Sequence, residues 1–298
     1  MTAPRILMDG LGIGESPRWH DGRLWFCNWG DDEVIALSPD GRAEVVFSEP
    51  GVGAHSIDWL PDGRMLIVPK NTDRGRLLRR EADGSLVPHA DLSGLPSGFN
   101  EIVVDGRGNV YVNGADFDFL AFLEKAMADG MDTPLHERPD FVPGYIALIT
   151  PDGRARQVAG DIAFPNGMVV SPDGRTLIIA ESFTGTLTAF DVASDGSLSN
   201  RRTWAAGLGP DGICMDAEGA VWTSTGGNEV VRVREGGEVL ERVELDRGPF
   251  ACMLGGPDGR TLYVVAAEWN PADPFGGPRT GQVLAVDAPA PRAGWPGH

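Results

Sequence analysis

The chain alternates short apolar segments with polar turns, and this alternation occurs six times. Each copy has an apolar segment, an Asp-Gly turn or a close variant, and a second apolar segment. Asp-Gly and Asn-Gly supply the positive φ that tight turns require, so each copy predicts a β-hairpin. The turns are marked by six glycines, Gly22, Gly63, Gly108, Gly174, Gly219 and Gly259.

A third apolar segment follows each hairpin, and a fourth usually follows that, such as EVVF at 44–47. Four strands in a repeat of about 40–45 residues are typical of propeller blades. The sequence therefore predicts an all-β fold, a six-bladed β-propeller with four-stranded blades, formed by residues 1–298 as a single domain. The last repeat lacks a fourth strand. We expect the segment RILMD at 5–9 to supply it and to close the ring.

The interval between Gly108 and Gly174 is longer than the others and indicates one helical insertion around residues 117–143. Its segment DFLAFLEKAMADGM carries Leu120, Leu123 and Met127 at helical spacing, which predicts a short helix. An inserted helix beside a pocket can act as a lid, and a plain surface loop is the alternative.

One position in each repeat lies at a nearly constant distance before the turn glycine. It holds, in chain order, Glu15, His55, Asn100, Asn166, Asp211 and Ala251. Equivalent positions of blades around an axis converge, so we expect these side chains at the mouth of the central channel. Four of the six carry a carboxylate or amide oxygen, which is the donor type that hard divalent cations prefer.

The sequence therefore predicts one divalent metal cation. Its predicted ligands are Glu15, Asn100, Asn166 and Asp211. These oxygen donors favour Ca²⁺ as the bound ion. The same donor set is also compatible with Mg²⁺, Mn²⁺, Fe²⁺ or Zn²⁺. Four protein oxygens leave coordination positions for water and substrate, as at a catalytic ion. Any one of these residues alone could instead be a turn former that bonds its own backbone.

Composition and charge indicate which partners and which cellular location to expect. The formal net charge of −18 disfavours nucleic acid and anionic membranes, which bind basic patches. No apolar run approaches the roughly 18 residues that span a bilayer, and the first residues lack a signal-peptide core, so we expect a cytoplasmic protein. The three cysteines form no CxxC pair, and we expect free thiols.

Three motifs resemble signature segments of the SMP-30/gluconolactonase/regucalcin family. They are GESPRW at 14–19, FPNGMVVSPDGRTLIIAES at 164–182 and GPDGICMDAEGAVW at 209–222. The resemblance implies a six-bladed propeller that holds one divalent metal and hydrolyses sugar or other lactones. By the same resemblance, Glu15, Asn166 and Asp211 match metal ligands. Asn100 matches a residue that touches the metal's water or the substrate, and Asp211 also matches the proposed general base.

The chain departs from the sugar-lactone members of that family at Gly98, where they carry an arginine that binds sugar hydroxyls. Without that arginine, we expect a substrate that is less polar than a sugar lactone. Aromatic candidates for the pocket are Phe99, Phe117, Phe119, Phe164, Phe183, Phe250 and Trp269. The predicted substrate contacts are Asn100, His55, Asp118, Phe119 and Trp269. His55 could also be a proton carrier, a metal ligand or a structural histidine.

These features together predict a metal-dependent hydrolase that opens a small-molecule lactone, with metal-activated water and Asp211 as the base. An ester or phosphotriester hydrolase on the same scaffold is one alternative, because a fold does not determine a reaction. A non-catalytic Ca²⁺-binding regulatory protein is a second alternative. A propeller that binds partners through its faces is a third, and it leaves the carboxylates at the mouth unexplained.

Overall fold

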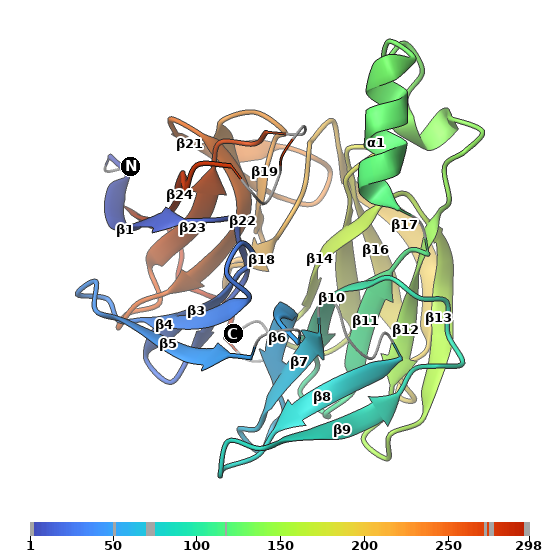
Figure 1. The fold of residues 1–298 in the computed structure, drawn as a ribbon, viewed down its shortest axis with the longest axis horizontal. Helices are drawn as coiled ribbons and strands as arrows, with labels where there is room; N and C mark the ends of the chain where they lie inside the picture. Colours follow the sequence, from blue (N-terminus) through green and yellow to red (C-terminus); the bar gives the residue numbers. More distant parts are fainter. Residues whose placement is uncertain are drawn as a thin grey trace.

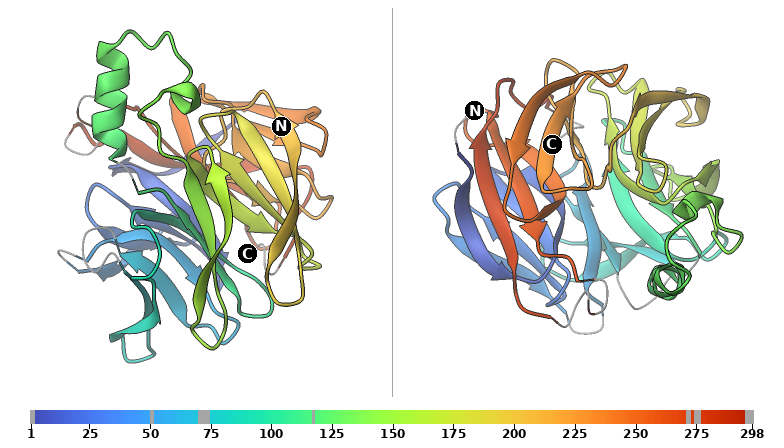
Figure 2. Two further views of the ribbon diagram at one scale, coloured as in Figure 1. Left: turned by 90° about the vertical axis from the view of Figure 1, so that its right-hand side faces the viewer. Right: turned by 90° about the horizontal axis from the view of Figure 1, so that it is seen from above.

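The computed structural model describes residues 3–49, 52–69, 75–116, 118–270, 273 and 277–294. Within these residues the strands form six four-stranded sheets. Figures 1 and 2 show the sheets arranged as blades around a central axis.

The first three blades follow one another along the chain. Blade 1 contains β2 (Gly14–His20), β3 (Arg23–Asn28), β4 (Glu33–Leu37) and β5 (Ala43–Ser48). Blade 2 contains β6 (Ala54–Trp59), β7 (Met65–Pro69), β8 (Arg76–Arg80) and β9 (Leu86–Asp91). Blade 3 contains β10 (Phe99–Val104), β11 (Val110–Gly114), β12 (Gly144–Ile149) and β13 (Ala155–Ile162).

The remaining three blades continue in the same manner until the ring closes. Blade 4 contains β14 (Pro165–Val170), β15 (Thr176–Glu181), β16 (Thr186–Val192) and β17 (Leu198–Ala206). Blade 5 contains β18 (Cys214–Met215), β19 (Val221–Ser224), β20 (Glu229–Val233) and β21 (Val239–Glu244). Blade 6 contains β22 (Gly248–Gly255), β23 (Thr261–Ala267), β24 (Gly281–Asp287) and β1 (Arg5–Leu11).

The first strand of each blade lies next to the first strands of the neighbouring blades. β2 contacts β6, and the contacts continue through β10, β14, β18 and β22 back to β2. The innermost strands therefore form a closed ring, and the predicted six-bladed propeller is confirmed. The six turn glycines all have positive φ, as the predicted hairpins require.

The ring closes through the N-terminal strand. β1 pairs antiparallel with β24, with Arg5 opposite Ala285 and Ile6 opposite Leu284. Figure 1 shows this blue strand beside the red strands of the C-terminal part. The prediction that the segment at 5–9 completes the last blade is confirmed. Pairing β24 in this way covers an edge that would otherwise present unpaired backbone groups.

Much of the apolar core lies between adjacent blades. At the closure, Trp19 of blade 1 stacks on Tyr263 of blade 6, with ring centroids 5.5 Å apart. A Cβ atom at Gly255 would lie 2.3 Å from the Trp19 ring, so only glycine leaves room for this contact. The three cysteines are free and buried, as predicted.

The predicted insertion is helical and leaves the propeller at the end of β11. It contains the helix α1 (Phe119–Ala128) and the 3₁₀ turn η1 (Leu135–Glu137). Figures 1 and 2 show α1 standing out from the sheets at one end of the ring. Phe117, where the insertion was predicted to begin, lies outside the described residues. No helix in the described ranges is long and apolar enough to cross a membrane.

Candidate active site

The positions selected by the repeat lie at the second residue of the innermost strand in blades 1 to 4, within the strand in blade 6, and before it in blade 5. The corresponding residues of blades 1, 2, 3, 4 and 6 are Glu15 in β2, His55 in β6, Asn100 in β10, Asn166 in β14 and Ala251 in β22. In blade 5 the corresponding residue, Asp211, precedes the short strand β18. Phe99 pairs with Gly114, so the insertion after β11 leaves from the same end of the channel.

The two predicted carboxylate ligands are close enough to influence each other's charge. Burial raises the pKa of Glu15 well above its usual range, and the negative charges of Asp211 and Glu101 raise it further. Burial, followed by the charge of Glu101, raises the pKa of Asp211 to about 8. Oδ1 of Asp211 is buried and has no hydrogen-bond partner among the described residues. The charge of Arg18 lowers the pKa of Glu15, but it is the smallest of the causes and does not offset burial and the neighbouring carboxylates.

The two predicted amide ligands are each held through the amide nitrogen. Nδ2 of Asn100 donates to the backbone oxygen of Pro165 over 3.2 Å. Nδ2 of Asn166 donates to Oγ of Ser182 over 3.4 Å. These contacts leave the carbonyl oxygen Oδ1 of each amide as its ligand atom.

This donor set fits a hard divalent cation. Two carboxylates and two amide oxygens are the ligands that such cations prefer, and a cation would compensate the orphaned Oδ1 of Asp211. Among the described residues, no three His, Cys, Asp or Glu side chains are grouped to hold a metal. A cation at the mouth would therefore need the amide oxygens of Asn100 and Asn166.

A third buried carboxylate, Glu101, was missed by the sequence analysis. Its Oε2 accepts from Nη2 of Arg18 over 3.0 Å, and the same nitrogen donates to the backbone oxygen of Ile102 over 2.6 Å. Nε of Arg18 also lies 3.8 Å from Oδ1 of Asp58. Burial raises the pKa of Glu101, and the Arg18 charge opposes that rise. In the sequence, Glu101 directly follows Asn100 and so lies one residue after the position that recurs in each repeat. This neighbourhood was the one sequence feature that could have identified it.

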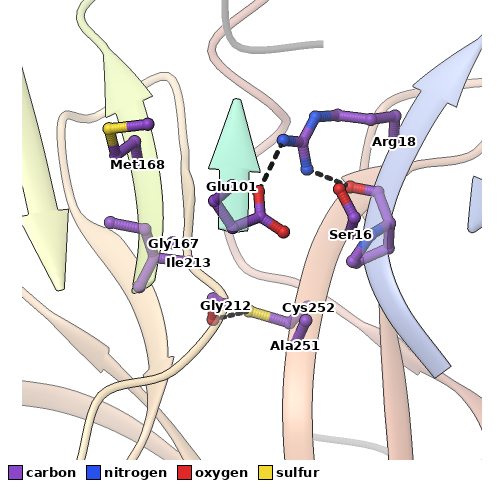
Figure 3. Close-up of a pocket in the computed structure, with 10 residues that line it drawn as sticks. Ser16, Arg18, Glu101, Gly167, Met168, Gly212, Ile213, Ala251 and Cys252 are labelled. Atoms are coloured by element: carbon purple, nitrogen blue, oxygen red, sulfur yellow. Dashed lines mark hydrogen bonds and ion pairs between the residues drawn. The ribbon is translucent and has the colours of Figure 1, made fainter. Parts of the chain in front are cut away.

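Arg18 and Glu101 line a cavity within the ring of innermost strands. Figure 3 shows the two side chains facing each other, with Met168 and Ile213 on the opposite wall. Gly212 and Cys252 also line the cavity. Gly212 follows Asp211, so the buried Arg18–Glu101 ion pair lies close to the predicted ligands.

The backbone explains why Gly98 cannot be an arginine. Its φ is +81°, and a Cβ atom there would lie 2.0 Å from the backbone oxygen of Ala115. A Cβ atom at Gly114 would lie 2.3 Å from the backbone oxygen of Gly98. The two glycines therefore bring the strands of blade 3 together at the mouth, and no side chain can be placed at Gly98 without moving the backbone.

Aromatic side chains connect the insertion with the mouth at blade 4. Phe164, two residues before Asn166, stacks on Phe183 with ring centroids 4.3 Å apart. Phe119 of α1 packs against Phe164 at 4.8 Å. Asp118 is the N-cap of α1, because its Oδ1 accepts from the backbone nitrogen of Ala121 over 3.0 Å. α1 is thus fixed against the blade that carries Asn166.

The other two predicted substrate contacts lie on different blades. The ring of His55 lies 4.3 Å from that of Trp29, and the Trp29 indole donates to the backbone oxygen of His55 over 2.9 Å. Trp269 is 39% exposed and contacts Phe250 edge to face at 5.9 Å. The backbone oxygen of Phe250 accepts from the backbone nitrogen of Gly212 over 2.8 Å. This contact places the Phe250–Trp269 pair next to the Asp211 segment.

Comparison with known proteins identifies relatives over most of the chain. Regucalcin of Xenopus laevis is 27% identical over 290 residues, covering 91% of each protein. Pentonolactonase XacC of Haloferax volcanii is 25% identical over 277 residues, covering 90% of this chain and 86% of the relative. A shorter match, 31% identical over 134 residues, links 43% of this chain to 46% of the 6-deoxy-6-sulfogluconolactonase of Pseudomonas putida.

Solved structures share the fold. A calcium-binding protein, regucalcin, from Agrobacterium tumefaciens matches with a TM-score of 0.74 and 23% identity. The match covers 98% of this chain and 95% of that chain. The model of the family described as SMP-30/Gluconolactonase/LRE-like region matches residues 13–268. This chain therefore belongs to the SMP-30/gluconolactonase/LRE-like family.

Proposed function

We propose that this protein is a divalent-metal-dependent hydrolase that opens a lactone. The observation that carries the proposal is the oxygen set at the mouth, where the buried Oδ1 of Asp211 lacks a partner among the described residues. The relatives named as lactonases support the reaction class. Ca²⁺ is the first candidate ion, because hard oxygen donors suit it.

Different residues of the chain would bind the ion and transfer the proton in this reaction. Glu15, Asn166 and Asp211 would hold the ion, and Asn100 would hold it or a water beside it. When bound, a divalent ion polarises a carbonyl oxygen and lowers the pKa of water. The Asp211 carboxylate accepts the proton of the attacking water as the new carbon–oxygen bond forms. It then returns the proton to the ring oxygen as the ester bond breaks.

We further propose that the substrate is less polar than a sugar lactone. The backbone contact at Gly98 leaves no place for an arginine that would bind sugar hydroxyls. Phe119 offers apolar surface beside Phe164, near Asn166. Trp269 offers apolar surface beside Phe250, near the Asp211 segment. His55 is proposed as a further contact. Asp118 uses Oδ1 to cap α1, so its proposed contact with substrate would come from its other oxygen.

The test is a metal and activity measurement on the purified protein. We expect about one divalent ion per chain by elemental analysis, and loss of lactone hydrolysis after chelation. D211N should lower kcat by at least about 100-fold, because it removes the proton acceptor. Aryl and alkyl lactones should be opened faster than gluconolactone. A protein without stoichiometric metal would refute the central claim.

A Ca²⁺-binding regulatory protein is the second candidate. It is favoured by the relatives named regucalcin, one of which is described as a calcium-binding protein. The same experiment separates the two candidates. For this purpose the lactones are supplemented with esters and phosphotriesters, because the fold itself does not determine the reaction. Stoichiometric Ca²⁺ without hydrolysis of any of these compounds would support binding alone.

A further inference from the structure

Ser182 lies between two of the predicted metal ligands, although it belongs to neither segment. It follows β15 directly and is half-buried. Its Oγ donates to the backbone oxygen of Pro210 over 2.7 Å and accepts from Nδ2 of Asn166 over 3.4 Å. Pro210 precedes Asp211 in the chain. One hydroxyl group thus contacts the side chain of one predicted ligand and the peptide unit that leads to the other.

The hydroxyl determines which way the Asn166 amide faces. A serine hydroxyl has one proton to donate, and in Ser182 that proton is directed to Pro210. Oγ can therefore only accept from Asn166, which requires the amide nitrogen to face the serine. An amide turned by 180° would place Oδ1 against an oxygen that has no proton left. The carbonyl oxygen of the Asn166 side chain therefore faces away from Ser182.

The same hydroxyl helps to fix the position of Asp211 relative to blade 4. The backbone nitrogen of Gly167, which follows Asn166, donates to the backbone oxygen of Asp211 over 3.2 Å. With the bond from Ser182 to Pro210, blade 4 holds the Pro210–Asp211 segment at two successive carbonyl groups. The two predicted ligands are therefore positioned by one connected set of hydrogen bonds.

We propose that Ser182 is a positioning residue for the metal site, which orients the Asn166 amide and joins it to the Asp211 segment. The proposal rests on the proposed function, because it assumes that Asn166 and Asp211 bind the ion. Outer groups that orient ligands typically change metal affinity by about 10–100-fold when they are removed. In this proposal Ser182 acts through its hydrogen bonds to Asn166 and Pro210.

Blade 5 offers a matched control in Ser224. Its Oγ donates to the backbone oxygen of Gly209 over 2.7 Å, the same distance as the bond from Ser182 to Pro210. Gly209 and Pro210 are consecutive residues, so S182A and S224A each remove a serine-to-carbonyl bond from one segment. Only S182A also removes the contact that orients the Asn166 amide.

The experiment measures Ca²⁺ affinity by calorimetry for the wild type, S182A, S182T and S224A, after chelator treatment. We expect S182A to weaken binding by about 10–100-fold, S224A to change it by less than about threefold, and S182T to restore it because threonine keeps the hydroxyl. Thermal unfolding in chelator should give a slightly larger loss for S182A than for S224A. Each variant loses a 2.7 Å bond from serine to a backbone oxygen, and S182A also loses the longer 3.4 Å contact with Asn166.

The outcomes distinguish the two proposals. Equal Ca²⁺ affinities for S182A and S224A, with metal still bound by the wild type, would overturn the role of Ser182 and leave the proposed function intact. Failure of S182T to restore binding would also overturn it, provided that S182T unfolds at the same temperature as the wild type. A wild-type protein that binds no divalent ion would overturn both proposals.

Discussion

The Asp211 carboxylate has opposite consequences for stability and for function. Burial and the Glu101 charge raise its pKa to about 8, whereas an unfolded chain has the ordinary value near 3.8. Between these pH values the folded metal-free protein keeps a proton that the unfolded chain releases. Stability from this group is therefore present at low pH and decreases as pH rises towards 8. Under the proposed function, Asp211 would be needed as a metal ligand despite this cost to stability.

The first prediction follows for the metal-free protein. Its free energy of unfolding should fall between pH 5 and 8 by up to about 1.4 kcal/mol per pH unit, the limit for one proton. D211N cannot ionise, so its slope should be smaller and the variant should be the more stable protein at pH 8. Urea unfolding in chelator measures both slopes. Equal slopes would mean that Asp211 does not carry the unfavourable charge.

Gly98 gives a second prediction at the scale of one residue. G98A should destabilise the protein by about 1–3 kcal/mol more than G63A, the range typical of overpacking. The two glycines have nearly the same φ, +81° for Gly98 and +83° for Gly63, so alanine at either position has a similar cost from the left-handed backbone. They differ because a Cβ atom at Gly63 meets nothing within 4 Å. Comparable losses in thermal unfolding would contradict the steric argument.

The site could be predicted only as far as the repeat symmetry extends. Equivalent positions in equivalent blades converge, so the sequence placed Glu15, Asn100, Asn166 and Asp211 at one end of the channel. Glu101 and Ser182 were not selected as ligands or orienting groups. Glu101 lies one residue out of phase, and Ser182 acts through a hydrogen bond between blades. Neither relation can be read from spacing along one chain.

At the scale of elements, α1 combines a buried aromatic face with an exposed apolar one. Phe122 is 6% exposed and stacks on Phe183 at 5.9 Å, while Met127 of the same helix is 49% exposed. The helical period predicted that a helix exists, because apolar residues recur on its faces. It could not predict which face packs on blade 4, since the contacting Phe183 lies far along the chain.

The third prediction concerns how α1 is held. F122A should remove about 3–5 kcal/mol of packing, and hydrogen exchange should show lost protection within Phe119–Ala128. The strands of the blades should keep their protection, because α1 is an insertion outside the six sheets. M127A serves as the control on the exposed face and should leave the exchange of α1 unchanged. Global unfolding of F122A would instead show that the propeller depends on the insertion.

At the scale of the molecule, the repeat makes the blades nearly equivalent, and closure makes one of them different. Blade count and closure could be predicted because each blade carries its own hairpin signal and the last one lacks a strand. The packing between blades depends on particular contacts, such as Trp19 with Gly255 and Tyr263. These pair the first and last repeats and have no counterpart in the repeat pattern.

Closure also determines where one predicted ligand lies, which gives the fourth prediction. β1 ends at Leu11, which is 3% exposed in the core, and β2 with Glu15 begins at Gly14. Removing residues 1–10 should lower the melting temperature by at least about 5 °C and expose the edge of β24 to association. The truncation should also weaken Ca²⁺ binding, because it removes most of β1, the strand that fixes the chain just before Glu15. Calorimetry and sedimentation measure these effects, and a truncated protein with unchanged Ca²⁺ affinity would show that blade 1 positions Glu15 without the closing strand.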